Sequence, residues 1–512
     1  MNRKQTIKEI LLYGMIGLLS LYLLYPILVV GMHNYPSGDD YWFGIYTYQG
    51  FLHNGIIGAF KGSLKMIGEI YETWQGTWFT LFLFTLSPQN FNAHCYFLTV
   101  YISLICLGIA YFIILKRYLY YEYGFSRITL ICAFFMIYHL SVQYIPRTTS
   151  GIFWFNGIMH YTIPFLIAMG CISSSRLILH CDNTKLYFTK IMLLLGMIAL
   201  GGSNYLAAII GMAGVMYEML QKILIERQEK KLAIKKYVIF ISAIVLEFVG
   251  LYVSYKSPGN NIRANDDMSF RPVYFIKCIW WSIDRSRIEL VKMFSERPVL
   301  WLYLCVTIIL IALELISRRK RLNQNKRLIK YPIMSLIFVN GVHVASYLPE
   351  VYAASDVSGG VPNTHYWMLL IVILADIIIL EDVFFYIINT RTRNANNTMR
   401  FEGIPNVVYY IVPLLLVLFV ACYIAFGSQK TTNDYCKEYI SSGKMYEYEK
   451  IWWEAYAIFT DTGIDDAIVP DYHEDIYPVC HMTLSEDSDV GHNVNRARYY
   501  DKKTVTAYVD ND

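Results

Sequence analysis

The sequence predicts an all-α polytopic membrane protein with about eleven transmembrane helices and a small α/β domain at its C-terminal end. Composition is the first reason: 55% of the 512 residues are hydrophobic and only 16% are charged, whereas soluble proteins carry about a quarter charged residues. The second reason is that apolar runs recur along residues 1–426, many of them near the ~20 residues that a helix needs to cross a bilayer.

The expected spans follow one another with short connections on one side and longer ones on the other. They cover residues 10–31, 94–115, 128–145, 161–179, 188–201, 204–221, 237–255, 299–316, 331–348, 366–388 and 406–426. The fifth and sixth are short and are separated only by Gly201-Gly202-Ser203-Asn204, so they form either a tight hairpin of two spans or a re-entrant pair.

The first apolar run is expected to stay in the mature protein. Arg3, Lys4 and Lys8 precede it, as in a signal peptide. The run is longer than the apolar part of a signal peptide, and no small-residue cleavage site follows it. We therefore expect a retained first span.

Lysine and arginine fix the expected orientation. The connections that would lie inside with a cytoplasmic N-terminus hold 25 of the 44 lysines and arginines. Basic connections stay on the cytoplasmic side. The sequence thus predicts a multi-pass protein of the cell membrane with a cytoplasmic N-terminus and an extracytoplasmic C-terminal domain, residues 427–512, following the membrane domain, residues 1–426.

Two adjacent carboxylates, Asp39 and Asp40, open the first outer segment, residues 32–93. They are either plain interface charges or a catalytic pair. A carboxylate that aromatic neighbours partly desolvate can take a proton from an acceptor hydroxyl. The second carboxylate would perturb the pKa of the first, or the two would hold a divalent cation. Gly38 favours Asp39 as the base, because a glycine lets the backbone turn the next side chain away from the helix end.

Aromatic and amide side chains follow in the same segment. Tyr41 adjoins the carboxylates, and Glu72, Trp74 and Gln75 belong to a stretch that ends at Trp78. Such residues form either an interfacial aromatic belt or a surface that stacks on a sugar and hydrogen-bonds to it. A short helix over residues 51–67 is expected to lie in the membrane interface.

Further candidates come from later outer segments. Arg147 and Arg263 run against the positive-inside trend and either clamp a lipid phosphate or form structural contacts. Trp154, Asn156 and His160 stand where polar atoms would meet lipid, as an aromatic anchor or as substrate contacts. Asn260 belongs to Ser257-Pro258-Gly259-Asn260, which is a turn by its chemistry.

The cysteines of the sequence allow one disulfide in the C-terminal domain. Only Cys436 and Cys480 of the ten cysteines fall in the polar C-terminal domain. An oxidising exterior would allow a disulfide between them.

In order along the chain, these motifs resemble those of the GT-C superfamily of membrane glycosyltransferases, and are most similar to a bacterial branch of unknown function. The resemblance is carried by short motifs spread over nearly the whole chain: Gly38-Asp39-Asp40-Tyr41, Thr73-Trp74-Gln75-Gly76, Trp154-Phe155-Asn156-Gly157 with Tyr161 and Pro164, Ser257-Pro258-Gly259-Asn260 with Arg263, and Asn495-Arg496-Ala497-Arg498-Tyr499-Tyr500. Thr77 and Asn204 depart from it, standing where an arginine and an acidic residue are expected.

The resemblance implies transfer of a sugar from a polyprenyl-phosphate carrier to an acceptor outside the cytoplasm, with a first-loop aspartate as base. The expected partners are the lipid-linked sugar, a cell-envelope glycan acceptor and membrane lipid, without nucleic acid. No cofactor is expected beyond an optional divalent cation. Attack opposite the phosphate would invert the anomeric centre.

Three other functions stay open on the residues alone. A surface-glycan polymerase or ligase also has large outer loops with cationic residues. A lipid-linked sugar transporter would place ionisable residues at mid-membrane, where Glu247, Glu314 and Asp376 are the clearest candidates. A non-catalytic membrane scaffold is the third.

Overall fold

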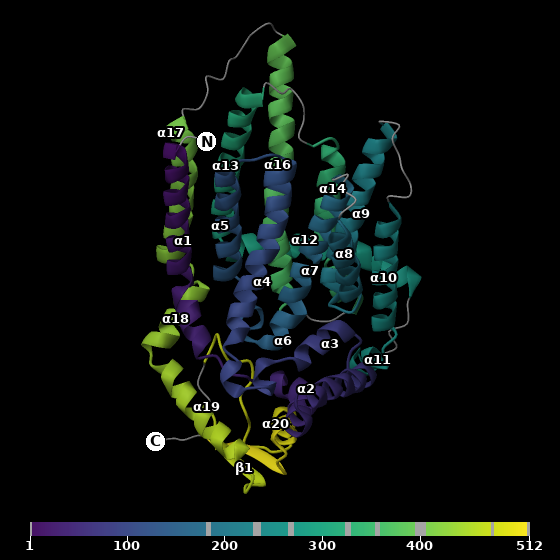
Figure 1. The fold of residues 1–512 in the computed structure, drawn as a ribbon, viewed down its shortest axis with the longest axis vertical. Helices are drawn as coiled ribbons and strands as arrows, with labels where there is room; N and C mark the ends of the chain where they lie inside the picture. Colours follow the sequence, from purple (N-terminus) through teal and green to yellow (C-terminus); the bar gives the residue numbers. More distant parts are fainter. Residues whose placement is uncertain are drawn as a thin grey trace.

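The computed structural model describes residues 3–180, 186–228, 237–264, 271–322, 329–353, 359–394, 406–472 and 476–508. It consists of a bundle of long helices with a smaller module at one end (Figure 1). Of the residues in these ranges 81% are helical, which confirms the predicted all-α class.

Eleven helices of the bundle coincide with the eleven apolar segments expected from the sequence. They are α1 (Arg3–Met32), α4 (Leu98–Leu115), α5 (Arg127–Gln143), α7 (Ile163–His180), α8 (Tyr187–Gly201), α9 (Tyr205–Gln228), α10 (Val238–Tyr255), α13 (Val299–Leu322), α14 (Pro332–Ala345), α16 (Val361–Asn394) and α17 (Asn406–Phe426). Within the described residues, seven helical segments are long and apolar enough to cross a membrane. A multi-pass membrane protein is therefore confirmed, and the count of eleven spans stays a prediction.

The outward faces of these helices are apolar, as a lipid environment requires. On α10, for example, Val245, Phe248 and Val249 are largely exposed. A continuous apolar surface of this kind is unusual on a soluble protein and typical of one that faces lipid or a partner. Backbone polar groups are satisfied within each helix, which makes the helix suitable for the bilayer.

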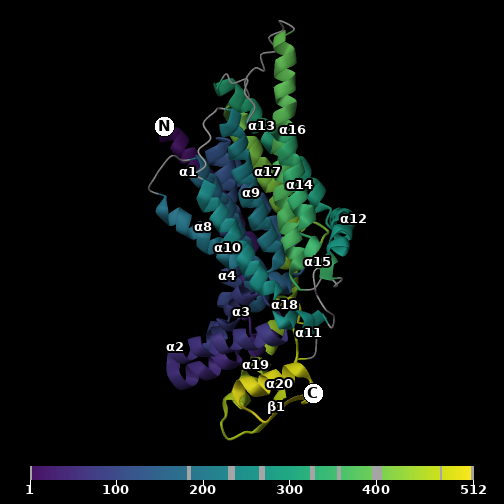
Figure 2. The ribbon, with the colours of Figure 1, turned by 90° about the vertical axis from the view of Figure 1, so that its right-hand side faces the viewer.

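Further elements gather at the end of the bundle away from the start of α1, which we call the α2 end (Figures 1 and 2). They are α2 (Asp39–Thr73), α3 (Trp78–Thr85), η1 (Pro88–Asn90), η2 (Ala93–Cys95), η4 (Thr149–Phe153), α6 (Phe155–Gly157), η5 (Ile158–Thr162), α11 (Pro258–Ala264) and α15 (Leu348–Ala353). Helix α12 (Pro272–Glu296) lies alongside the bundle, against α14 and α15. A π-helical turn, η3 (Lys116–Glu122), lies at the other end of α4.

Helix α2 is a folded-back pair of arms instead of the single short helix expected over residues 51–67. Asn54 and Gly55 have non-helical backbone angles, and Gly55 has a φ of 59°. Gly50 and Gly58 let the two arms touch, because a Cβ on either would meet the backbone of the other. Ile56 and Ile57 at the bend are 78% and 70% exposed, as expected for a hairpin whose tip rests in the membrane interface.

The C-terminal module contains α18 (Thr432–Ser441), α19 (Lys444–Thr460), β1 (Asp466–Pro470), α20 (Gly491–Tyr500) and β2 (Thr504–Tyr508). The two strands pair in parallel, with Ala467 opposite Val505, so the module contains both helices and strands, as the sequence predicts. In both views α2 lies between the long helices and α20.

Cys436 and Cys480 are free cysteines, so the disulfide considered for this module is not formed. The physical reason is that the two thiols lie in different surroundings and do not meet. Cys436 is fully buried on α18, whereas Cys480 lies beside Tyr448 and Ser37.

We expect the α2 end to face the outside of the membrane, because the basic connections predict a cytoplasmic start of α1. Alkaline phosphatase fused after the last residue should therefore be active. A cytoplasmic reporter at the same position should be inactive. An active cytoplasmic reporter with an inactive phosphatase would contradict the predicted orientation.

Candidate functional site

Asp39 and Asp40 are the first two residues of α2, and Gly38 is the N-cap. Gly38 has a φ of 55° and a ψ of −123°. Such a backbone conformation is open to glycine and strained for any other residue. The glycine thus turns the chain from the end of α1 into α2 and sets the direction of both carboxylates.

The Asp40 carboxylate is completely buried and anchored. The Tyr96 hydroxyl donates to its Oδ2 over 2.5 Å, and the Ser37 backbone N–H donates to the same atom over 3.2 Å. Tyr96 in turn accepts from the backbone N–H of Phe155 over 3.2 Å. Asp40 and Tyr96 therefore join the start of α2 to the segment before α4 and to the first residue of α6.

Burial raises the pKa of Asp40 from 3.8 to about 7. An ionised carboxylate that is removed from water is energetically costly, so burial favours the neutral, protonated form of Asp40. Hydrogen bonds from Tyr96, Ser37 and the backbone of Asn156 oppose this rise, and the nearby Asp39 charge adds to it.

This raised pKa predicts a pH-dependent stability. Between about pH 4 and pH 7 the unfolded chain has lost the Asp40 proton while the folded protein keeps it. The free energy of unfolding should therefore fall as pH rises through this window, by at most roughly 1.4 kcal/mol per pH unit from this group. Asp40→Asn cannot ionise and should flatten the slope. Thermal unfolding between pH 4.5 and 8 checks this, and parallel curves for the two proteins would contradict it.

Asp39 differs from Asp40 because its carboxylate is partly exposed. Among the described residues it makes no hydrogen bond and no ion pair. Burial raises its pKa, and the positive charge of Arg263 opposes that rise. Of the two carboxylates, Asp39 is thus the one that a ligand can reach, and the Arg263 guanidinium is close enough to lower its pKa.

Aromatic contacts explain how Arg263 comes to lie near the first turn of α2. The Trp42 ring meets the Trp74 ring edge-on at 5.9 Å. Arg263, on α11, lies over the Trp74 ring at 5.0 Å. Its Nη1 donates to Oε1 of Gln75 over 2.7 Å. The guanidinium is otherwise exposed, so it has donors left for a ligand.

Two motifs lie beside Arg263 and touch each other although they are far apart in the chain. They are Thr73-Trp74-Gln75-Gly76 and Ser257-Pro258-Gly259-Asn260. The Gly76 backbone N–H donates to Oδ1 of Asn260 over 3.2 Å. A Cβ on Gly259 would strike the backbone nitrogen of Trp74, and one on Gly76 would strike the carbonyl oxygen of Ser254. The glycines are needed because backbones approach closely here.

His160 joins the α8–α9 hairpin to this end of the bundle. Its Nδ1 lies 3.1 Å from Oγ1 of Thr80 on α3, and its carbonyl accepts from the Asn204 side chain. Gly202 leaves room for the Trp78 indole. Asn204, the polar residue of the hairpin, is therefore a backbone partner for His160.

Trp154 and Asn156 present polar atoms without partners. Trp154 stacks on His481 at 4.0 Å, yet its indole Nε1 has no hydrogen-bond partner. Neither amide atom of Asn156 has one either, although the residue is only 2% exposed. Buried polar atoms in proteins are nearly always paired, so unpaired ones next to Asp40 indicate a place for a ligand or water.

The structure separates three predicted residues from this group. Arg147 is exposed and is held through its backbone, which exchanges hydrogen bonds with Asn363 over 2.8 and 2.9 Å. Tyr41 is buried, with the Arg496 guanidinium 3.5 Å from its ring centre. Glu72 is exposed at the last turn of α2. Tyr41 thus holds the C-terminal module, and a substrate role for all three stays a prediction.

Two residues near the carboxylates escaped the sequence reasoning. Tyr96 binds Asp40, and His481 lies against Trp154 with its backbone N–H donating to Oγ of Ser37 over 3.0 Å. Neither stands in a recognisable pattern. The sequence places His481 in the C-terminal domain, on the same expected side of the membrane as the carboxylates, but nothing in it indicates a contact with Trp154.

No group of three histidine, cysteine, aspartate or glutamate side chains suited to a metal ion occurs in the part of the chain that the structure describes. The Asp pair alone supplies two carboxylates, so a divalent cation there stays an open hypothesis. No protein-family model matches the sequence, and no curated protein matches it.

Proposed function

We propose that the protein transfers a sugar from a polyprenyl-phosphate carrier to a cell-envelope acceptor outside the cytoplasm, with Asp39 as general base. The observation that carries this proposal is a reachable, unpaired carboxylate beside the exposed guanidinium of Arg263. A base and a cation at the membrane boundary are what a lipid-linked phosphate donor requires.

In the proposed step one bond to the anomeric carbon forms while another breaks, and one proton moves to Asp39. Asp39 takes the proton of the acceptor hydroxyl while the hydroxyl oxygen attacks the anomeric carbon of the sugar. The bond from that carbon to the phosphate oxygen breaks, and its electron pair leaves with the polyprenyl phosphate. Attack from the face opposite the phosphate inverts the anomeric centre. Burial raises the pKa of Asp39, and this direction suits a general base because it makes the carboxylate a stronger proton acceptor.

Arg263 is the proposed phosphate contact. Its planar guanidinium can donate two parallel hydrogen bonds to phosphate oxygens. The Trp74 ring beneath it and the Gln75 amide beside it hold it in place. Asn156 and Trp154, with unpaired polar atoms, would contact the sugar or the acceptor.

The finer architecture belongs to the same proposal. We infer eleven spans because every apolar segment of the sequence falls on a helix of the bundle. A GT-C-like frame with an extracytoplasmic module agrees with carboxylates that directly follow the first long helix.

Reconstituted protein tests the proposed function. Proteoliposomes would receive a polyprenyl-phosphate donor with a radiolabelled sugar, together with envelope glycan as acceptor. We expect label in the glycan and an inverted anomeric linkage by NMR. Movement of intact donor across the bilayer without transfer would instead favour the transporter.

A further inference from the structure

A cavity of about 430 Å³ lies inside the bundle, far from the Asp pair. Residues of α4, α7, α9, α14 and α16 line it, with Tyr118 and Glu122 of η3. Helix α4 begins two residues after Tyr96, which binds Asp40, and the cavity lies at its other end. Eighteen helical residues separate the two by about 27 Å. The cavity is therefore not part of the candidate catalytic site.

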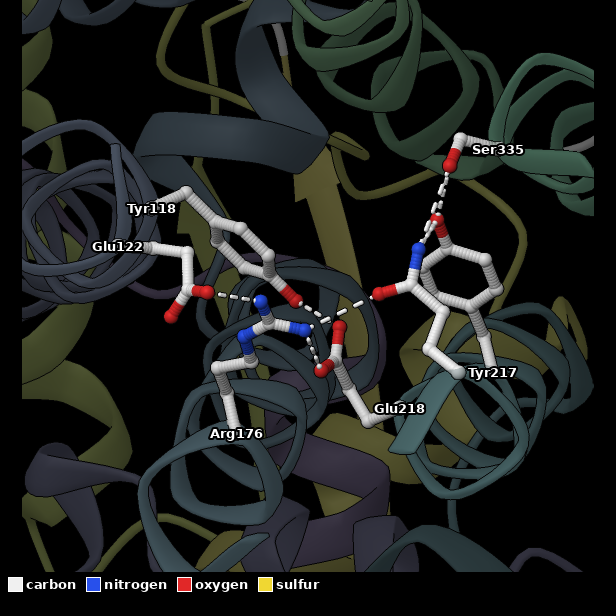
Figure 3. A network of polar contacts seen from close by, with 7 residues as sticks. Tyr118, Glu122, Arg176, Tyr217, Glu218 and Ser335 are labelled. Atoms are coloured by element: carbon white, nitrogen blue, oxygen red, sulfur yellow. Dashed lines mark hydrogen bonds and ion pairs between the residues drawn. The ribbon is translucent and has the colours of Figure 1, made fainter. Parts of the chain in front are cut away.

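A buried ion-pair network forms one wall of the cavity (Figure 3). Nη1 of Arg176 donates to Glu218 over 2.8 Å and to Gln221 over 3.1 Å, and its Nη2 pairs with Glu122. The Tyr118 hydroxyl donates to Glu218 over 2.5 Å. Such a network inside a membrane bundle is costly and calls for a functional reason.

The cavity lining includes two buried polar atoms that find no hydrogen-bond partner among the described residues. They are Nε of Arg176 and the hydroxyl of Tyr331, both buried. Arg176 is only 7% exposed, so water has little access to it. An N–H and a hydroxyl that are left unpaired call for the acceptor oxygens of a ligand.

Charge at this wall favours an uncharged ligand. Arg176 lies between two carboxylates, Glu122 and Glu218. Nζ of Lys222 lies 3.9 Å from Oε1 of Glu226. Among the described residues, Arg176 and Lys222 thus each have a carboxylate within 4 Å, so a phosphate here would compete with Glu122 and Glu218 for the guanidinium and be repelled by both.

We propose that this cavity binds an uncharged glycerolipid. Its ester or hydroxyl oxygens accept hydrogen bonds from Arg176 and Tyr331, and its acyl chain lies among apolar side chains such as Ile172, Ile210 and Met368. The volume is within the range of pockets that bind small molecules, about 300–1,000 Å³. The lining helices stand in a bundle whose outside is apolar, so lipid is the ligand most available to it.

Photolabelling tests this proposal with the full chain in lipid nanodiscs and a diazirine-bearing diacylglycerol as probe. Ala375 lines the cavity on α16, whereas Leu380 lies five residues on, 56% exposed and outside the lining. Ala375→Phe should lower labelling of cavity peptides about tenfold, because a filled cavity excludes the chain. Leu380→Phe is the matched control and should label like wild type. Equal labelling of both variants would overturn the proposal.

The head group is tested separately. Tyr331→Phe removes the unpaired hydroxyl, keeps the ring and should lower labelling by about fivefold. A diazirine-bearing phosphatidylglycerol should label the cavity more weakly than the diacylglycerol. Stronger labelling by phosphatidylglycerol would overturn the assignment of an uncharged head. Matching thermal unfolding of all variants shows that a loss of labelling is not a loss of fold.

Discussion

Asp39→Asn should lower turnover of sugar transfer by roughly 100- to 10,000-fold while binding of the lipid-linked donor persists. Asparagine keeps the shape of the side chain but cannot take the acceptor proton. Asp39 makes no hydrogen bond with the described residues, so its replacement should leave the fold intact. Single-turnover kinetics with a labelled donor separates the chemical step from binding.

Asp40→Asn is the matched control for this prediction. Its carboxylate is fully buried and accepts from Tyr96 and Ser37, so it supports the start of α2 without reaching a substrate. We expect a smaller loss of turnover than in Asp39→Asn. The reverse order would exchange the roles of the two carboxylates.

Arg263→Ala should weaken donor binding by roughly 10- to 100-fold, the worth of a hydrogen-bonded charge on phosphate. Arg263→Lys should restore only part of the affinity, because the bidentate fork is lost. Titration with fluorescent polyprenyl phosphate measures both.

Arg147→Ala is the control variant to which the donor affinity of Arg263→Ala should be compared. The sequence predicts both arginines as phosphate contacts, yet only Arg263 influences Asp39. Donor affinity should therefore change little in Arg147→Ala. An equal loss in both variants would mean that the phosphate lies between the two arginines, and unchanged affinity in both would remove the proposed clamp.

The sequence predicted the positions of the long helices well, but it predicted poorly which residues contact one another across the fold. Apolar runs located the long helices because hydrophobicity is a local property of the chain. Gly76 and Gly259 belong to two motifs that the sequence shows separately, and only the structure shows that the two backbones pack closely at these glycines. The bend of α2 at Asn54 and Gly55 was missed because an exposed Asn-Gly within a helical pattern reads as a weak interruption.

Buried polar partners were beyond the reach of sequence reasoning. The sequence predicts Glu247, Glu314 and Asp376 as the clearest ionisable residues of the spans. In the structure Glu314 contacts the start of α5 and Asp376 contacts Asn340. The sequence does not predict the pairing of Arg176 with Glu218. A buried ion pair depends on how helices far apart in the chain pack, which no spacing in the sequence reveals.

The first outer segment and the C-terminal module were predicted as separate regions that share one side of the membrane. His481 and Arg496 show how closely they meet, since the His481 backbone N–H donates to Ser37 and the Arg496 guanidinium lies over Tyr41. The candidate site is thus assembled from both regions, which a span count alone does not indicate.

Complementation of a deletion strain tests the central claim most directly. Surface glycan would be analysed in cells that carry wild type, Asp39→Asn or the Asp39→Asn, Asp40→Asn double variant, each at equal membrane level. The account predicts that wild type restores the sugar that the deletion removes and that both variants fail to restore it. Full restoration by the double variant would contradict the proposed transferase mechanism.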